Sequence, residues 1–461
     1  MRVVQGYRFA LDLTPGQERA VLRHAGAARV AHNWGLARVE AVLGQRAAER
    51  SYGVSEDQLT PEVGWSLYSL RKDWNQAKAT VAPWWADCSK EAFNTGLDAL
   101  ARGLKNWADS RSGKRKGRRS GFPRFKSRRR STPTVRFTTG AIRVEADRHH
   151  VTLPRLGLLK THESTRTLAR RIEVGTARIL SATVRREGGR WFVAFTCEVD
   201  RAEKTPTRPD AVVAIDLGIT TLAVLSTGES VPNPRHLNTA LSRLRRLSRT
   251  VSRRIGQDRR TGQHASGRRG HADRARARAH ARVANLRRDG LHKLTSNLAA
   301  TFGTVVVEDL HVAGMLGNRR LARHLSDAGF GQIRRQLAYK TTWNGGRLLV
   351  ADRWFPSSKT CSGCGAVKTK LVLSERTYHC DQCGLSIDRD LNAAHNLAAL
   401  ADETDVAGSG PETPNGRGAD QKTRPLGQVA AKRQPGTTHA GKTGTVPPQD
   451  GTASRERTHA S

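Results

Sequence analysis

The sequence predicts an α+β protein of several domains, and three features lead to this expectation. A mostly helical stretch, residues 21–120, lies between segments that have the alternating polarity of β-strands. Farther along, apolar runs with the composition of buried strands are separated by long basic helices. A block of paired cysteines follows these runs. With 461 residues, the chain is long enough for two to four domains of ~150 residues each.

The N-terminal region is expected to form a small β-barrel with a helical insertion. Residues 3–13 alternate like a strand, and Thr14 followed by Pro15 predicts a capped helix start. Further helical segments are expected around residues 34–43, 65–77 and 89–107. Short strands separated by Gly and Pro fill residues 132–199, which favours a barrel. We assign residues 1–20 and 121–204 to this barrel and residues 21–120 to the insertion.

Two apolar strands in the middle of the chain carry acidic residues at their ends. One strand ends near Asp216, turns through Gly218 and returns as a second strand, and another carries Glu308. Asp388 and Asp390 precede a predicted helix over residues 391–400. Each acid alone has an ordinary explanation as a turn, loop or N-cap residue. Together, three carboxylates at the ends of two strands and one helix suit magnesium, and clustered carboxylates can hold two ions ~3.5–4 Å apart.

The cysteine spacing predicts a structural zinc site. The pattern is C-x2-C-x15-C-x2-C, formed by Cys361, Cys364, Cys380 and Cys383. Two such pairs can complete a tetrahedron of sulfurs around one ion, with Zn–S bonds of ~2.3 Å. The alternative is two disulfides or buried thiols. The opening residues lack the apolar core of a secretory signal and no apolar run is long enough for a membrane span, so we expect a cytoplasmic protein and favour zinc.

Strong positive charge predicts a polyanionic partner. The chain has 79 Lys and Arg against 41 Asp and Glu, a formal charge of +38. Eleven Lys and Arg and no acids fall between residues 111 and 130, in a run that also contains Phe122 and Phe125. We expect the charges to contact phosphates and the two rings to anchor the loop, the alternative being a solvated linker. The candidate nucleic-acid-binding residues are Lys114, Arg115, Lys116, Arg118, Arg119, Arg124, Lys126, Arg128, Arg129 and Arg130.

A second basic region is predicted to be a helical hairpin over residues 237–300. Between residues 241 and 300 there are seventeen Lys and Arg against three Asp, with helical spacing on both sides of a polar centre. We favour contact with nucleic acid, although an exposed hairpin without a ligand is the simpler alternative. Cys88 and Cys197 have no partner by spacing and are interpreted as packing residues. Residues 402–461 lack periodicity and are expected to be disordered.

Four motifs together resemble the TnpB family, RNA-guided endonucleases of insertion sequences that are related to type V CRISPR effectors. They are residues 215–223 around Asp216, residues 305–310 around Glu308, residues 358–365 around the first cysteine pair, and Asp388–Asn396. Residues 121–126 and the N-terminal strand and helix are also similar. The resemblance covers roughly residues 1–400, and its C-terminal motifs agree in content and order.

The resemblance implies catalytic, magnesium-binding roles for Asp216, Glu308 and Asp390, with Asp388 as a neighbouring, structural acid. It implies an RNase H-like (RuvC) core over residues 205–355 and 386–401, interrupted by a zinc ribbon over residues 356–385. The implied partners are a guide RNA from the transposon end and a double-stranded DNA target, which places the protein at the nucleoid. The sequence leaves the oligomeric state open.

Two other functions stay open at this point. A nuclease-inactive, RNA-guided DNA-binding regulator would be marked by loss of an acid, and all three acids are present. A strand-joining transposase would need a nucleophile such as a tyrosine in a His-rich motif. None of the five tyrosines has that setting, and Tyr378 beside His379 falls within the cysteine block.

Overall fold

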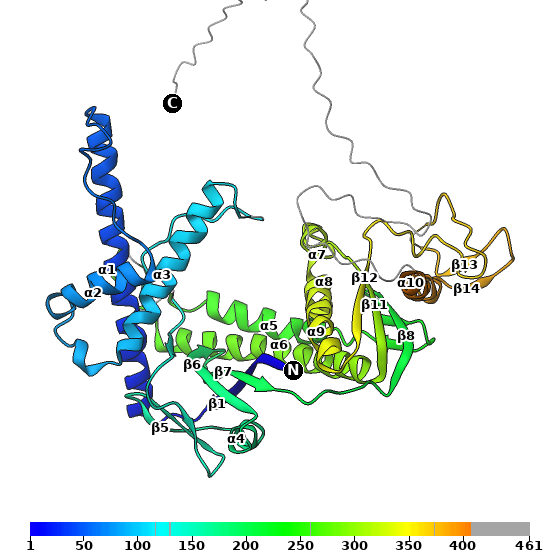
Figure 1. Ribbon diagram of the computed structural model, residues 1–461, viewed down its shortest axis with the longest axis horizontal. Helices are drawn as coiled ribbons and strands as arrows, with labels where there is room; N and C mark the ends of the chain where they lie inside the picture. The colour runs from blue at the N-terminus through cyan, green and yellow to red at the C-terminus, as the bar shows by residue number, and fades with distance from the viewer. Residues whose placement is uncertain (116, 129–130, 259, 373, 407–461) are drawn as a thin grey trace, which may run out of the picture. The chain divides into compact units, whose positions relative to one another are not determined.

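A computed structural model describes the backbone of residues 1–406, apart from residues 116, 129–130, 259 and 373. Figure 1 shows its helices and strands. Their buried side chains form two large hydrophobic cores. The first gathers side chains between Tyr7 and Val199, and the second gathers side chains between Val213 and Leu337. A third, small core surrounds the cysteines. The mixed α and β composition that the sequence predicts is confirmed.

The N-terminal core is built on two antiparallel sheets. The first has the order β1-β7-β6-β2, formed by β1 (Arg2–Leu11), β7 (Arg190–Asp200), β6 (Ala177–Glu187) and β2 (Thr134–Phe137). The second is formed by β3 (Arg143–Val144), β4 (His150–Leu153) and β5 (Gly157–Lys160). A bridge between Leu11 and Thr161 links them. These sheets lie in the residues for which we expected a barrel, and the barrel itself stays a prediction.

Helices cover the N-terminal sheets. They are α1 (Pro15–Ser51), α2 (Leu67–Val81), the short 3-10 helix η1 (Trp85–Asp87), α3 (Lys90–Arg111) and α4 (Arg166–Glu173). The predicted start of α1 is confirmed, because the Thr14 hydroxyl accepts a hydrogen bond from the Gln17 N–H and the Gln17 side chain accepts one from the Thr14 N–H. The segments expected around residues 65–77 and 89–107 correspond to α2 and α3, but our separation of residues 34–43 from the first helix was wrong. Residues 34–43 belong to one continuous helix that packs along α3.

The second core contains a five-stranded mixed sheet in the order β10-β9-β8-β11-β12. Its strands are β8 (Arg208–Leu217), β9 (Thr221–Leu225), β10 (Ser230–Pro232), β11 (Phe302–Glu308) and β12 (Arg347–Ala351). β9 runs antiparallel to β8 and to β10, whereas β11 runs parallel to both β8 and β12. The predicted turn after Asp216 and the strand that carries Glu308 are therefore confirmed.

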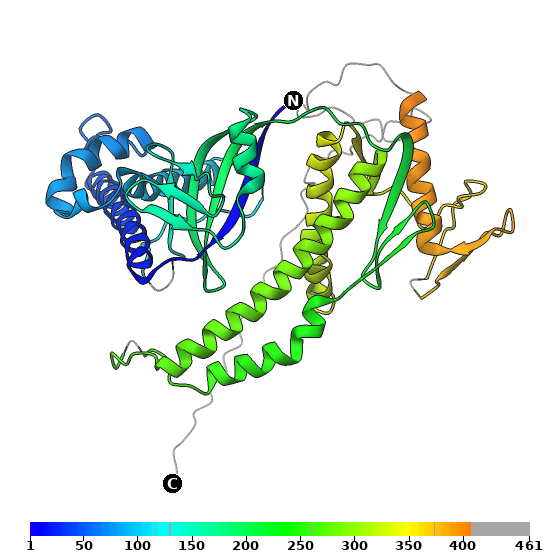
Figure 2. The same ribbon diagram turned by 90° about the horizontal axis from the view of Figure 1, so that it is seen from below.

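The helices of this region begin with a basic pair that lies side by side (Figure 2). The helices are α5 (His236–Ser252), α6 (Gly267–Thr301), α7 (Val312–Met315), α8 (Ala322–Ala328) and α9 (Phe330–Trp343). α5 and α6 are the two helices that the sequence predicts between residues 237 and 300.

The cysteine block contains the short strands β13 (Thr377–His379) and β14 (Ser386–Asp388), and α10 (Arg389–Val406) follows it. The expected tail began at residue 402, but α10 continues to Val406, so that boundary was wrong. Residues 407–461, where the rest of the disorder prediction falls, lie outside the described residues. None of the helices in the described part of the chain is long and apolar enough to cross a membrane.

Close packing of α1 against α3 yields a stability prediction. A Cβ atom on Gly96 of α3 would lie 1.9 Å from the Ala28 carbonyl oxygen of α1, so Gly96→Ala forces the helices apart. We expect a loss of about 1–3 kcal/mol in the free energy of unfolding. Gly44→Ala, at an exposed position of α1 with nothing within 4 Å, should instead stabilise by about 0.5–1 kcal/mol. Urea unfolding of both variants measures these changes. Equal changes in the free energy of unfolding would contradict the close packing of α1 against α3 at Gly96.

Candidate metal centres

Asp216 and Glu308 lie at the same edge of the five-stranded sheet. β8 and β11 are parallel neighbours whose register pairs Ile215 with Val307, and the next residue of each strand is an acid. Adjacent strands lie ~4.8 Å apart, and the carboxyl ends of parallel strands meet at one edge. The strand register alone therefore brings together two carboxylates that are 92 positions apart in the sequence.

Asp390 reaches this edge from the first turn of α10. The backbone N–H groups of Asp390 and Leu391 donate to Asp388 Oδ1, at 2.9 and 3.0 Å. Asp388 therefore caps α10, as expected for a structural acid, and Asp390 remains available for another role. Asp390 Oδ1 pairs with the guanidinium of Arg389 at 3.2 Å.

The three acids interact electrostatically. Burial first, and then the negative charges of Glu308 and Asp390, raise the pKa of Asp216 to about 7, against an opposing effect from Arg389. A carboxyl with this pKa is held where its charge is unfavourable. A divalent cation would offset that cost, since hard cations prefer carboxylate oxygens. The predicted convergence of the three acids on one metal site stays a prediction, and this electrostatic interaction supports it.

The three carboxylates nevertheless do not form a closed ligand set. Among the residues that the structure describes, only the four cysteines form a group of His, Cys, Asp or Glu side chains close enough to share one ion. Glu308 Oε1 accepts a hydrogen bond from Ser357 Oγ at 2.7 Å, and Asp390 is held by Arg389. The donor set therefore suits magnesium by its chemistry and its charge, but its oxygen atoms are not gathered around one point.

Two asparagines on α10 connect the acids to the cysteine block. Asn392 and Asn396 are almost fully buried one helical turn apart, and the side-chain amides of both donate to the Thr360 carbonyl, at 2.7 and 2.6 Å. Asn396 also donates to the Ser357 carbonyl at 2.7 Å. Because Ser357 holds Glu308, one chain of hydrogen bonds runs from Glu308 through Ser357 to the helix that carries Asp390.

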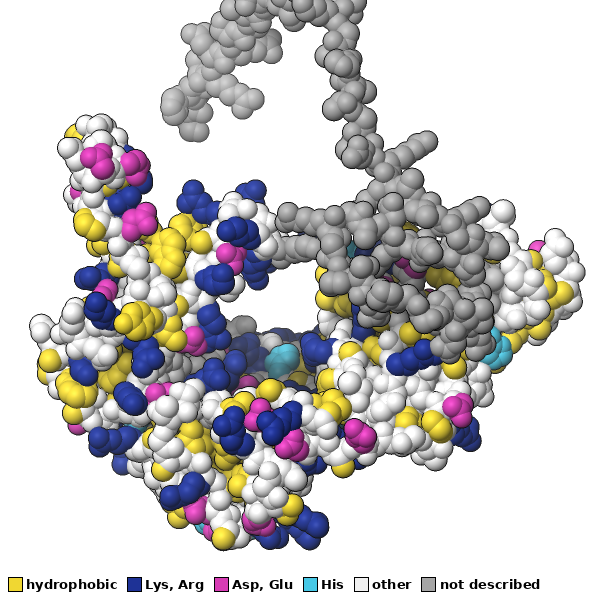
Figure 3. All heavy atoms as spheres, viewed as in Figure 1, with side chains coloured by type: hydrophobic (Ala, Val, Ile, Leu, Met, Phe, Trp, Pro, Cys, Tyr) yellow, Lys and Arg dark blue, Asp and Glu magenta, His cyan; other side chains and the backbone are white. Residues whose placement is uncertain are grey.

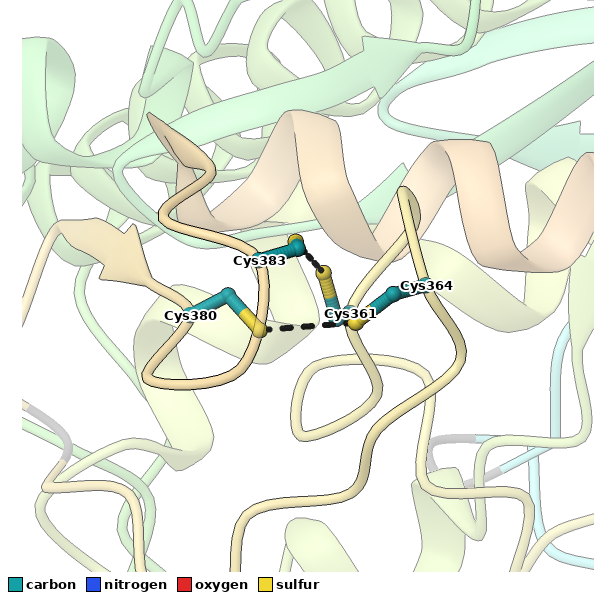
Figure 4. Close-up of side chains that lie close together, drawn as sticks. All are labelled: Cys361, Cys364, Cys380 and Cys383. Atoms are coloured by element: carbon teal, nitrogen blue, oxygen red, sulfur yellow. Dashed lines mark hydrogen bonds between the residues drawn. The ribbon is translucent and has the colours of Figure 1, made fainter.

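The four cysteine side chains face a common point (Figure 4). All four Sγ atoms lie within 4.8 Å of one another, and the Cys361–Cys383 and Cys364–Cys380 Sγ pairs are 3.6 Å apart. These separations exceed the ~2.05 Å of a disulfide. A tetrahedral zinc with Zn–S bonds of ~2.3 Å separates its sulfurs by about 3.8 Å. The sulfurs therefore fit a zinc ion and not two disulfides.

Local hydrogen bonds favour the thiolate form of one cysteine in this group. Backbone N–H groups of Cys383 and Gln382 lower the pKa of the Cys380 thiol to about 6, whereas hydrogen bonds among the thiols contribute to raised pKa values of Cys364 and Cys383. Zinc binds the thiolate form, so a thiol that ionises below neutral pH is suited to be a ligand. The first cysteine loop is anchored to α10 as well, because the Ser362 N–H donates to Asn392 Oδ1 at 2.9 Å.

The described candidates of the basic run lie mostly on the surface. Lys116, Arg129 and Arg130 lie outside the described residues. The exposed ones are Lys114, Arg115, Arg118, Arg119, Arg124 and Arg128. Lys126 is half-buried, and burial lowers its pKa. Figure 3 shows many more Lys and Arg side chains than Asp and Glu side chains on the face that it presents.

Lys126 and Arg128 line a cavity of about 1000 Å³ together with Arg19, Arg23, Arg29 and Arg186. α1 and β6 thus add cations that the sequence analysis did not single out. Phe122 packs edge-on against Trp107 at 4.9 Å, as expected for an anchor. The same interpretation was wrong for Phe125, which is 55% exposed.

Sequence reasoning also missed Ser357, Asn392 and Asn396. The sequence held a signal for the two asparagines. Their spacing of four residues within a mostly apolar part of the helix indicates a buried polar contact. The partner of each asparagine is a backbone carbonyl, which no sequence pattern identifies.

Replacement of one cysteine tests the zinc site. Cys361→Ser should reduce zinc content from about one ion per chain and lower the unfolding temperature, because metal binding is coupled to local folding. Asp381→Asn, an exposed change between the second pair of cysteines, should keep its zinc. Elemental analysis and thermal unfolding measure both effects. Unchanged zinc content in the serine variant would rule out the site.

Because the pKa of Asp216 is raised, we expect that replacing Asp216 increases the stability of the protein by an amount that depends on pH. Between about pH 4 and 7 the folded protein keeps a proton on Asp216 that the unfolded chain releases, so this group lowers stability as pH rises through that window. Asp216→Asn should therefore stabilise at pH 8, on the order of 2–4 kcal/mol, and much less at pH 5. Unfolding without added magnesium measures this. The control is Asp210→Asn, at the exposed start of β8, which should have little effect at either pH.

Three protein families match parts of the chain. Residues 194–319 match a family described as "Probable transposase" (OrfB of IS605), and residues 330–397 match the "Cas12f1-like, TNB domain". Residues 1–46 match a "Helix-turn-helix domain" of OrfB. In this chain those first residues form β1 and most of the single helix α1.

Several known proteins are similar over most of the chain. A Mycobacterium tuberculosis (strain H37Rv) protein named "Putative RNA-guided DNA endonuclease" is 41% identical, with 92% of each chain covered. A protein of the same name from Streptomyces pristinaespiralis is 39% identical over 70% of this chain and 75% of its own. A solved Cas12f1–sgRNA–target DNA complex aligns with 86% of this chain and 99% of its own at 13% identity and a TM-score of 0.44. The identity and coverage of the mycobacterial relative, with the matching OrfB families, show that this chain belongs to the TnpB family.

Proposed function

We propose that this protein is an RNA-guided DNA endonuclease encoded by an insertion sequence. The observation that supports the proposal is that Glu308 and Asp390 act on buried Asp216 at the end of β8 and contribute to its raised pKa. Relatives that are named RNA-guided DNA endonucleases support the same function. The sheet, with three antiparallel and two further parallel strands, supports the RNase H-like core that the resemblance implies.

The proposed reaction is hydrolysis of a DNA phosphodiester with magnesium held by the three acids. Magnesium bound there would activate the attacking water and stabilise the leaving oxygen. Asp216 and Glu308 would hold it from neighbouring strands, and Asp390 from the start of α10. Ser357 keeps Glu308 oriented toward this edge, and Arg389 limits the repulsion among the carboxylates. Ionisation of Asp216 accompanies cation binding, so activity should rise with pH toward about 8.

Guide RNA and target DNA are the proposed partners. The charge of +38 suits two polyanions at once, and base pairing would supply most of the sequence specificity. The basic cavity beside α1 is one candidate surface for phosphates. On α6, the exposed residues Arg274, Arg278 and Arg282 lie one helical turn apart and form another. A guide from the transposon end and a location at the nucleoid follow from the same proposal.

The remaining domain assignments belong to this proposal as well. They are a barrel over residues 1–20 and 121–204, a recognition insertion over residues 21–120, and a zinc ribbon over residues 356–385 that interrupts the nuclease core. The hydrogen bonds from Asn392 and Asn396 to Thr360 support this last arrangement, because they fasten the ribbon to the catalytic helix.

Plasmid cleavage by the purified protein–RNA complex tests the function. The guide is first identified by sequencing the RNA that co-purifies with the protein. The complex should then cut a matching plasmid only when magnesium is present, and Asp216→Ala should lower the rate by orders of magnitude, because the metal site loses a ligand.

The matched control is Asp210→Ala, at the opposite, exposed end of β8, which should cut normally. Equal cleavage by wild type and Asp216→Ala would end the catalytic assignment. Target binding without cleavage by the wild type would favour the inactive regulator, and strand joining without RNA would favour a transposase.

A further inference from the structure

Trp354 is unusually exposed for a tryptophan that lies in a fixed loop. It is 84% exposed and lies in the turn three residues after the end of β12. The Trp354 N–H donates to Asp352 Oδ1 at 2.8 Å, and the preceding Arg353 donates to Asp309 Oδ2 at 2.6 Å. These contacts tie the loop to the end of β11. A large apolar ring presented to solvent by a tethered backbone indicates a binding surface.

The same ring lines a cavity next to the proposed catalytic centre. The cavity has a volume of about 400 Å³, and Glu308 and Trp354 both line it, with Asp309, His311, Asp352 and Phe355. It opens where β11 and β12 end. A ligand stacked on Trp354 would therefore lie beside the carboxylate of Glu308.

The charges around the cavity select an uncharged, ring-shaped ligand. Three of the lining side chains are acidic, and the guanidinium of Arg353 is already paired with Asp309, which also pairs with Arg334. A phosphate in this cavity would be repelled. A nucleobase is neutral and stacks on an aromatic ring. Adenine, guanine and cytosine also carry exocyclic amino groups, which can donate hydrogen bonds to carboxylates. The volume is near the lower end of ligand pockets, ~300–1000 Å³, which suits one base and not a base pair.

We infer that this cavity binds one unpaired base of the DNA strand to be cut, stacked on Trp354. The base must be unpaired because, within a duplex, its faces are covered by neighbouring bases. Anchoring one base here would place an adjacent phosphate near Glu308, so Trp354 positions the strand for hydrolysis. The inference rests on the proposed function and adds to it a specific subsite for single-stranded DNA.

The test is a scan of the DNA strand with single abasic sites, read by binding. Oligonucleotides carrying one abasic site at each position in turn are bound to the protein–RNA complex of the Asp216→Asn variant. In that variant cleavage is suppressed, so binding is measured even if the nuclease assignment fails. One position should be special, because loss of its base weakens binding by about 5- to 100-fold.

A second substitution on the same background decides whether Trp354 is responsible. With Trp354→Ala added, intact DNA should bind about 5- to 100-fold more weakly, and the abasic site at the special position should have no further effect. Trp354→Phe should restore most of the affinity, because it keeps a stacking surface. Tyr52→Ala, which removes an 87% exposed ring elsewhere, should bind like its parent.

Three results would overturn the inference. The first is equal DNA binding with and without Trp354, and the second is a special position that persists in Trp354→Ala. The third is loss of self-association in Trp354→Ala with unchanged DNA binding, because the ring would then be a contact between protein molecules. If cleavage by the wild type fails while the abasic pattern depends on Trp354, the subsite stands and only the nuclease chemistry is wrong.

Discussion

The burial of Asp216 beside two other carboxylates is the constraint around which the second half of this protein is built. Asp216, Glu308 and Asp390 come from two strands and a helix, and burial, together with the charges of Glu308 and Asp390, raises the pKa of Asp216 to about 7. Such an arrangement costs stability at neutral pH, and it persists because the surrounding structure enforces it. The parallel pairing of β8 and β11 enforces half of it, since the register leaves no other place for the first two acids.

The other half depends on how α10 is held. Asn392 and Asn396 fix the helix to the loop that precedes and begins the cysteine block, and Ser357 in the same loop holds Glu308. The cysteine block therefore does more than add a small domain. Its first loop is one of the supports that set the separation of Glu308 and Asp390. A substitution at a cysteine should therefore shift the carboxylates through these hydrogen bonds, without any direct contact between a cysteine and a carboxylate.

Much of the site was accessible from the sequence because local rules fix it. Cysteine spacing, an acid at the end of an apolar strand, and Asp388 before a helix each act within a few residues, and the structure contains all three. The continuity of α1 was missed because tertiary packing overrides local preference. Gly35 leaves room for Leu100 of α3, whose methyl would lie 2.8 Å from an added Cβ, so a glycine that weakens an isolated helix here permits close packing.

Contacts between distant segments account for the other omissions. Asn392 and Asn396 act through the backbone carbonyls of Ser357 and Thr360. The basic cavity draws Arg19 and Arg29 from α1 and Arg186 from β6. Trp354 was missed for the opposite reason, because a tryptophan between Arg353 and Phe355 has no pattern that separates an exposed ring from a buried one. Exposure is a property of the folded chain.

The most direct measurement is the position of a bound divalent ion. Crystals of the protein–RNA complex grown with Mn²⁺ in place of Mg²⁺ should show anomalous scattering at the sheet edge, from manganese coordinated by Asp216, Glu308 and Asp390. The same crystals should show zinc, distinguishable by its absorption edge, among the four cysteines. Manganese bound elsewhere, with the three carboxylates too far apart to share an ion, would contradict the account.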